Sequence, residues 1–135
     1  SRLDELQAAI LRVKLRYMDQ DNEKRRKLAN RYVNNLKDTN LILPKVTEET
    51  EHVFHLFVIR SKNRDNLMKK LKDSGVHTMV HYPYSVHKQK AFKKYSNEKL
   101  VITESVTDTI LSLPIYPELS FEEVDKISAL IQKHS

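Results

Sequence analysis

The sequence contains a single glycine, Gly75, among 135 residues. This is about a tenth of ordinary glycine usage. Loops that bind phosphate groups through backbone amides depend on glycine, because a residue without a side chain lets the amides approach the oxygens closely. The chain therefore has neither a P-loop nor a dinucleotide-binding glycine loop. If the protein handles a phosphorylated cofactor, another segment of polypeptide must supply most of the phosphate site.

The remaining composition is that of an ordinary folded protein with one domain. Hydrophobic residues make up 39% of the chain and charged residues 31%, and this length is enough to bury a modest core. No apolar run approaches the roughly 18 residues of a membrane span, and we expect no signal peptide. The absence of cysteine excludes disulfides, thiolate nucleophiles and zinc fingers. We therefore expect a cytoplasmic protein that does not interact with membranes.

Helical periodicity dominates the beginning of the chain. Apolar residues recur at steps of three and four along residues 3–18, and Leu28, Tyr32 and Leu36 continue the pattern. This predicts one long helix, bent or interrupted near residues 19–22. Its first half carries a wide apolar stripe, which favours burial against more than one neighbour. The pattern fits a connector between lobes, a subunit contact or a plain core helix equally well.

The rest of the chain alternates strand and helix patterns. Residues rich in β-branched and aromatic side chains predict strands at 52–60, 76–82 and 111–114. The sequence therefore predicts an α+β domain, with a small, mostly antiparallel three-stranded sheet and helices packed on one face. The expected helices are 63–74, capped by Asn63 and stopped by Gly75, then 87–95, a helix from Thr103 or Ser105 to Ile110, and one from the Ser120–Glu123 capping box to the end.

Polar aromatic residues are concentrated between His77 and Phe92, where three of the six histidines and two of the six tyrosines surround Pro83. A strand delivers His81 and Tyr82 to the sheet edge, and the proline ends the ladder. Rings at such an edge usually face a ligand or another subunit. The four-residue spacing of His77 and His81 would suit a metal on a helix, but along a strand it separates the rings by about 13 Å. We therefore expect no metal site.

No arrangement of residues indicates a complete catalytic site. A Ser-His-Asp hydrolase needs a nucleophile on a tight turn, and the chain has no glycine-flanked serine. The lysines lie on polar helix faces or in loops, whereas a Schiff-base lysine needs a desolvated setting. The net charge of +6 leaves open a stand-alone module that binds nucleic acid or another polyanion through residues 24–27 and 88–94. Acidic residues interrupt these clusters, which favours a solvated face.

Four segments of the chain, in order, resemble one family: SRLDELQAA at 1–9, HVFHLFVIR at 52–60, VHYP at 80–83 with HKQ at 87–89, and LSLPIYPEL at 111–119. They are similar to the nucleotide-sugar aminotransferases of the DegT/DnrJ/EryC1/StrS type, which use pyridoxal phosphate. The resemblance covers essentially the whole chain and matches the C-terminal, small domain of these fold-type I enzymes. It implies that residues 1–38 form a long interdomain helix and residues 39–135 the α+β body.

The resemblance implies a dimeric parent enzyme that transfers an amino group from glutamate to a nucleotide-linked keto-6-deoxyhexose, most closely a dTDP sugar. The large domain carries the Schiff-base lysine and most phosphate donors, so we expect this chain alone to bind no cofactor, to contain no catalytic residue and to be inactive. By resemblance, His81, Tyr82 and Arg2 bind substrate, and His87 and Gln89 support the loop. Nucleic acid is not an expected partner.

Overall fold

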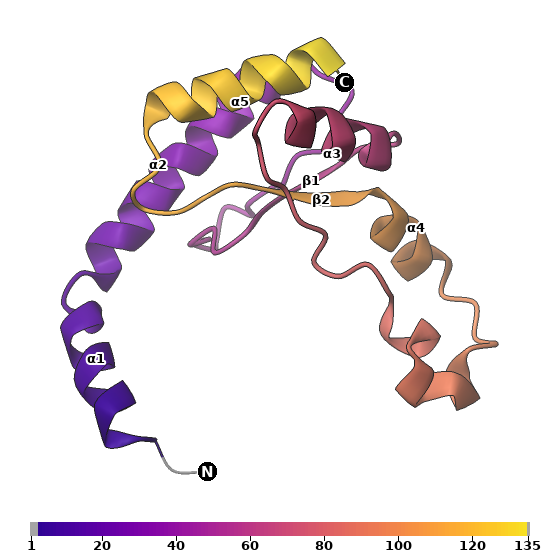
Figure 1. The fold of residues 1–135 in the computed structure, drawn as a ribbon, viewed down its shortest axis with the longest axis horizontal. Helices are drawn as coiled ribbons and strands as arrows, with labels where there is room; N and C mark the ends of the chain where they lie inside the picture. Colours follow the sequence, from indigo (N-terminus) through magenta and orange to yellow (C-terminus); the bar gives the residue numbers. More distant parts are fainter. Residues whose placement is uncertain (1–2, 135) are drawn as a thin grey trace.

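The computed structural model describes residues 3–134, which form an arch with the sheet and three helices at its top (Figure 1). Strand β1 (Phe57–Arg60) pairs antiparallel with β2 (Ile110–Leu113), so that Phe57 lies opposite Leu113. Two isolated bridges extend this pairing, one from Ile42 to Arg60 and one from Met79 to Ser112. The chain is thus α+β with an antiparallel sheet, as predicted.

The expected third strand at residues 76–82 is wrong, because within residues 3–134 the sheet has two strands. Met79 alone pairs with the sheet: its N–H donates to the Ser112 carbonyl at 3.2 Å, and its carbonyl accepts from the Ser112 N–H at 2.7 Å. The chain leaves the ladder directly afterwards, and Pro83 has no N–H with which to extend it.

Strand β1 is also shorter than the predicted 52–60. Phe54 has a φ of 48°, in the left-handed region, and its N–H donates to His52 Nδ1 at 2.8 Å. This local turn uses a backbone donor that a ladder would need. Regular pairing therefore begins only at Phe57.

The helices are α1 (Glu5–Leu15), α2 (Met18–Leu36), α3 (Arg64–Asp73), α4 (Val101–Thr109) and α5 (Phe121–His134), with short 3-10 helices η1 (Val86–Lys88) and η2 (Lys90–Tyr95). The predicted helix at 87–95 is therefore two 3-10 segments, separated by the extended backbone of Gln89.

The long N-terminal helix is interrupted earlier than expected. The N–H groups of Arg16 and Tyr17 donate to carbonyls three residues back, those of Val13 at 3.2 Å and Lys14 at 3.0 Å. Such bonds tighten the last turn of a helix. The interruption thus lies at residues 16–17, and α2 begins before the predicted break at 19–22.

Local helix signals agree well with the structure at two of three positions. Ser120 N–H donates to Glu123 Oε2 at 2.8 Å, and Glu123 N–H donates to Ser120 Oγ at 3.2 Å, which confirms the capping box. Gly75 has a φ of 81° after α3, as predicted. The predicted Asn63 cap is wrong, since its side chain makes no capping bond. Its own N–H instead donates to Ser61 Oγ at 3.2 Å.

The core lies between the sheet and helices α2, α3 and α5. The Tyr32 ring stacks on Phe57 with centroids 5.0 Å apart, and its hydroxyl donates to the Pro114 carbonyl at 3.0 Å. Burial raises the pKa of Tyr32 well above its ordinary value. The other fully buried core residues on these elements are Ala29, Leu36, Ile59, Leu67, Leu71, Leu111, Val124 and Ile131.

Polar contacts also join α2 to α5, which lie side by side (Figure 1). Arg31 donates two hydrogen bonds to the Asp125 carboxylate, at 2.8 and 2.7 Å, and Asn35 Nδ2 donates a third at 2.8 Å. These donors hold the pKa of Asp125 at about 2, below its ordinary value of 3.8. The ionised carboxylate therefore stabilises the folded chain.

This contact predicts a pH dependence of stability. Because the folded pKa of Asp125 is lowered, its contribution is complete above about pH 4 and is lost as the pH falls to about 2. Asp125→Asn should lower the unfolding midpoint at neutral pH, and its difference from the unchanged chain should vanish only below about pH 2. Denaturant unfolding across this range measures the effect, with Asp38→Asn as control. A difference that is independent of pH would contradict the expectation.

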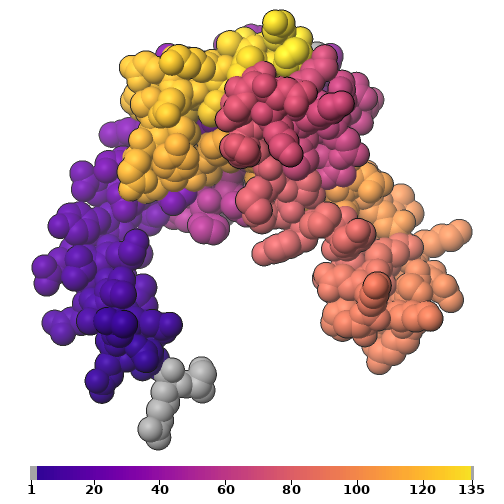
Figure 2. All heavy atoms as spheres, viewed as in Figure 1, coloured from indigo at the N-terminus to yellow at the C-terminus, as the bar shows by residue number. Residues whose placement is uncertain are grey.

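The apolar stripe of α1 is exposed, contrary to the predicted burial against several neighbours. Leu6 is 71% exposed, Ile10 51% and Val13 53%, and α1 has no buried residue. The helix extends away from the core and forms one arm of the arch, while residues 84–100 lie in the other arm (Figure 2). No residue of α1 is buried by the rest of residues 3–134, so its apolar stripe is left largely uncovered there.

Candidate functional site

The predicted site residues cluster in the segment that follows the Met79 bridge, residues 81–89, which we call the aromatic loop. His81 Nδ1 lies 2.8 Å from Ser112 Oγ, within hydrogen-bond distance. Ser112 is buried in β2, and its backbone also forms the bridge to Met79. One residue of the sheet therefore fixes both the start of the loop and the His81 ring.

Tyr82 and Tyr84 project from the loop into solvent. Their side chains are 74% and 69% exposed. The Tyr82 ring meets the His81 ring edge to face, with centroids 5.7 Å apart and an interplanar angle of 84°. Phenol and imidazole groups can donate and accept hydrogen bonds, and their rings can pack against a sugar. The exposed edge is thus suited to a polar ligand with hydroxyl or phosphate groups.

His87 is buried at the other end of the loop, where it is 6% exposed. Its Nε2 lies 3.0 Å from Glu104 Oε1, on α4. The hydrogen bond from His87 is the main cause of the lowered pKa of Glu104. This position agrees with a residue that supports the loop rather than one that binds a ligand.

The two remaining predicted residues are Gln89, at the end of the aromatic loop, and Arg2. Gln89 is exposed, and its hydrogen bonds among the described residues are formed by its backbone, with Val86 at 3.1 Å and Phe92 at 2.9 Å. Arg2 lies outside the described residues. The structure therefore brings His81, Tyr82, His87 and Gln89 into one loop. The sequence did not point to Ser112 or Glu104. The one signal for Ser112 is its place between two strand leucines, and Glu104 has no such signal.

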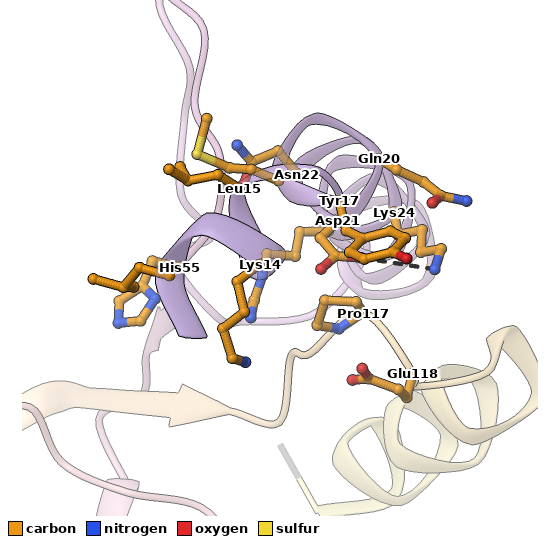
Figure 3. Close-up of a pocket in the computed structure, with 13 residues that line it drawn as sticks. Lys14, Leu15, Tyr17, Gln20, Asp21, Asn22, Lys24, His55, Pro117 and Glu118 are labelled. Carbon is orange, nitrogen blue, oxygen red and sulfur yellow. Dashed lines mark ion pairs between the residues drawn. The ribbon is translucent and has the colours of Figure 1, made fainter. Parts of the chain in front are cut away.

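A separate groove of about 730 Å³ lies where α1 meets α2 (Figure 3). Lys14 and His55 lie on one side of this groove and Pro117 and Glu118 on another. Its lining mixes cations, carboxylates and apolar side chains, and it includes the ion pair between Lys24 and Asp21 at 3.7 Å. Three segments that are distant in sequence form the groove, so no local pattern could predict it.

The basic cluster at residues 24–27 is occupied by partners within the chain. Arg26 pairs with Glu23 at 2.8 Å, Lys27 pairs with the same carboxylate at 3.7 Å, and Arg25 donates to the Ile115 carbonyl at 2.9 Å. Glu23 has a lowered pKa, chiefly because of the hydrogen bond from Arg26. This pairing favours the interpretation as a solvated helix face over a polyanion-binding surface.

Two groups that could occupy a site in the chain are a metal ion and pyridoxal phosphate. Residues 3–134 contain no group of three or more histidine, aspartate or glutamate side chains placed to hold a metal ion. Every lysine in this range is exposed, whereas a Schiff-base lysine needs a desolvated setting that lowers its pKa. The residues described therefore do not fit the cofactor by themselves. In the same range, no helix is both long and apolar enough to cross a membrane.

Sequence comparisons identify close relatives of the chain. Residues 1–132 match the model of the DegT/DnrJ/EryC1/StrS aminotransferase family. The chain is 42% identical to the dTDP-3-amino-3,6-dideoxy-alpha-D-galactopyranose transaminase of Aneurinibacillus thermoaerophilus, over 99% of its own length and 37% of the relative's. It is 43% identical to the erythromycin biosynthesis sensory transduction protein EryC1 of Saccharopolyspora erythraea, over 98% and 37% of the two lengths.

Solved structures show the same relationship. The chain superposes on S. venezuelae DesV, solved in complex with a ketimine intermediate, with a TM-score of 0.93 at 34% identity, covering 98% of this chain and 36% of DesV. A Brucella abortus aminotransferase gives a TM-score of 0.91 at 36% identity, covering 98% and 36%. The chain thus spans about 37% of the length of the curated relatives it matches. It belongs to the DegT/DnrJ/EryC1/StrS aminotransferase family and corresponds to the C-terminal part of its longer members.

Proposed function

We propose that the chain is the C-terminal domain of a pyridoxal-phosphate-dependent aminotransferase that acts on a dTDP-linked keto-6-deoxyhexose. The observation that carries this proposal is the match of 99% of the chain, at 42% identity, to a transaminase of a dTDP-linked amino sugar. Glutamate is the proposed amino donor and a homodimer in the cytoplasm the proposed assembly. The aromatic loop supports the assignment, because the rings of Tyr82 and Tyr84 are 74% and 69% exposed and can hydrogen-bond to a ligand.

Within this function, the chain's own residues bind and orient the substrate. The Tyr82 hydroxyl donates a hydrogen bond to the sugar or the diphosphate. His81 donates another from the ring nitrogen that does not face Ser112. Arg2 contacts a phosphate or another substrate group, and His87 and Gln89 support the loop. Pyridoxal phosphate, when bound, supplies the electron sink for amino transfer.

The rest of the aminotransferase supplies the cofactor site in this proposal. The exposed lysines of the described residues do not suit a Schiff base, so the isolated chain is expected to be inactive. The exposed stripe of α1 gives the other domain an apolar surface on which to pack, as in an interdomain contact. Coverage of 36% of DesV at a TM-score of 0.93 supports this arrangement, since most of that enzyme lies outside the matched region.

A chimera tests the function directly. Residues 1–135 would replace the matched 37% of the Aneurinibacillus transaminase. We expect the chimera to bind pyridoxal phosphate and to transfer an amino group from glutamate to the dTDP-linked keto sugar. Tyr82→Phe should raise KM for the sugar about tenfold through loss of one hydrogen bond.

Two controls make the result decisive. Tyr116→Phe removes the hydroxyl of a partly exposed tyrosine outside the loop, and it should leave KM unchanged. A folded chimera that carries cofactor but transfers no amino group to any nucleotide-linked keto sugar would refute the proposed function. Equal KM values for the Tyr82→Phe and Tyr116→Phe variants would refute the role of Tyr82.

A further inference from the structure

One carboxylate oxygen joins three parts of the arm that carries the aromatic loop. Glu104 Oε1, on α4, accepts from His87 Nε2 at 3.0 Å and from the Leu100 backbone N–H at 3.3 Å, and it lies 3.6 Å from Lys88 Nζ. Lys88 Nζ also donates to the Ser96 carbonyl at 3.3 Å. The loop, the turn before α4 and α4 itself therefore meet at a single side chain.

The orientation of the His87 ring depends on this contact. An ionised carboxylate accepts hydrogen bonds only, so Nε2 must carry the proton that Glu104 accepts. The other nitrogen, Nδ1, is buried and has no hydrogen-bond partner among the residues the structure describes. Within this range, Glu104 therefore supplies the one hydrogen bond that fixes the ring.

Packing does not replace this polar contact. A cavity of about 260 Å³ lies between the loop and α4, lined by Tyr84, Ser85, Glu104 and Thr107 among others. The side chains of Tyr82, Tyr84 and Val86 are mostly exposed. The loop is thus held at its two ends, by His81 with Ser112 and by His87 with Glu104, and not by close packing along its length.

We propose that Glu104 is a positioning residue, which acts through His87 to set the place of the Tyr82–Tyr84 edge. The effect of Glu104 on substrate binding rests on the proposed function. A Tyr82–Tyr84 edge that moves freely loses the preorganisation that binding needs. The effect on the loop does not depend on that function.

Hydrogen exchange in residues 1–135 tests the effect on the loop. The reporting amides are those of Lys88, Gln89 and Phe92, which donate to the loop carbonyls of Ser85, Val86 and Gln89 at 2.9–3.1 Å. Glu104→Ala should speed their exchange about tenfold, as expected for loss of a hydrogen bond to a charged group. Amides of α2, α5 and the sheet should not change. Glu104→Gln keeps an acceptor oxygen and should restore part of the protection.

The control is Glu98→Ala, which removes an exposed carboxylate from the same arm and should leave the exchange rates unchanged. Unchanged exchange in Glu104→Ala would overturn the proposal, and so would faster exchange spread over the core, which would indicate general destabilisation.

Kinetics of the chimera test the consequence for substrate. Glu104→Ala should raise KM for the nucleotide sugar with little change in kcat, and Glu104→Gln should lie between. A loosened loop with an unchanged KM would overturn the positioning role. An inactive unsubstituted chimera would instead refute the proposed function, while the exchange result would still decide whether Glu104 fixes the loop.

Discussion

Replacing Phe57 with alanine is expected to lower the free energy of unfolding by about 3–5 kcal/mol. Phe57 is fully buried in β1, stacked on Tyr32 at 5.0 Å and next to Phe54 at 6.0 Å between centroids. Truncation removes the buried ring and leaves a cavity that rigid neighbours cannot close. Because domains of this size are stable by only about 5–15 kcal/mol, the variant should be partly unfolded at modest denaturant concentrations.

Denaturant unfolding, followed by far-UV circular dichroism, measures this difference. Phe121→Ala is the matched control, because Phe121 is 47% exposed at the start of α5, and surface substitutions usually change stability by less than about 0.5 kcal/mol. Similar losses in the two variants would show that the stack with Tyr32 does not anchor the core.

The isolated chain is expected to associate through α1, and a charge-neutral pair of substitutions should abolish this association. Leu6 and Ile10 are 71% and 51% exposed on adjacent turns, and burial of such side chains drives association. Leu6→Glu combined with Ile10→Lys removes the apolar surface and places an acid four residues before a base, which supports a helix. The net charge of the chain stays the same.

Sedimentation velocity over a range of concentrations measures the effect. The unchanged chain should sediment increasingly as dimers or larger species, and the double variant as a monomer with the same unfolding midpoint. Gln7→Ala alters the same helix without removing the stripe, and it should associate like the unchanged chain. If the unchanged chain is monomeric at all concentrations, the exposed stripe of α1 does not promote association.

The parts of the fold that could be predicted depend on nearby residues. The capping box of Ser120 and Glu123 needs two side chains three positions apart, and the stop after α3 needs a glycine at φ 81°. Such signals act within one turn of chain, so the sequence contains all the partners. The class of fold followed from them and from the alternation of strand and helix patterns.

The predictions that failed concern elements whose packing partners lie far away in the sequence or outside the described residues. The alternating residues at 76–82 suit a strand, yet Met79 alone finds a ladder partner. The stripe of α1 has a true helical period, but periodicity shows that a face is apolar and not what covers it. A sequence pattern therefore predicts a helix or strand better than it predicts what packs against that element.

The candidate site also has a part that could be predicted from the sequence and a part that could not. His81 and Tyr82 were predicted through the family resemblance, and the structure places them together on an exposed edge, while their roles stay predictions. The residues that hold the loop in place were not predicted. Ser112 lies 31 residues from its partner His81, and Glu104 lies 17 residues from its partner His87. Tertiary contacts of that kind leave no local trace in the sequence.

The exposure of the aromatic loop bears on how this family could diversify. Tyr82 and Tyr84, at 74% and 69% exposure, contribute little to the buried core, so replacing them costs little folding free energy. The residues that hold the loop in place, Ser112 and Glu104, lie on separate elements. Under the proposed function, mutation at the loop's tip can therefore change the sugar preference, while selection for stability acts mainly on the body beneath it.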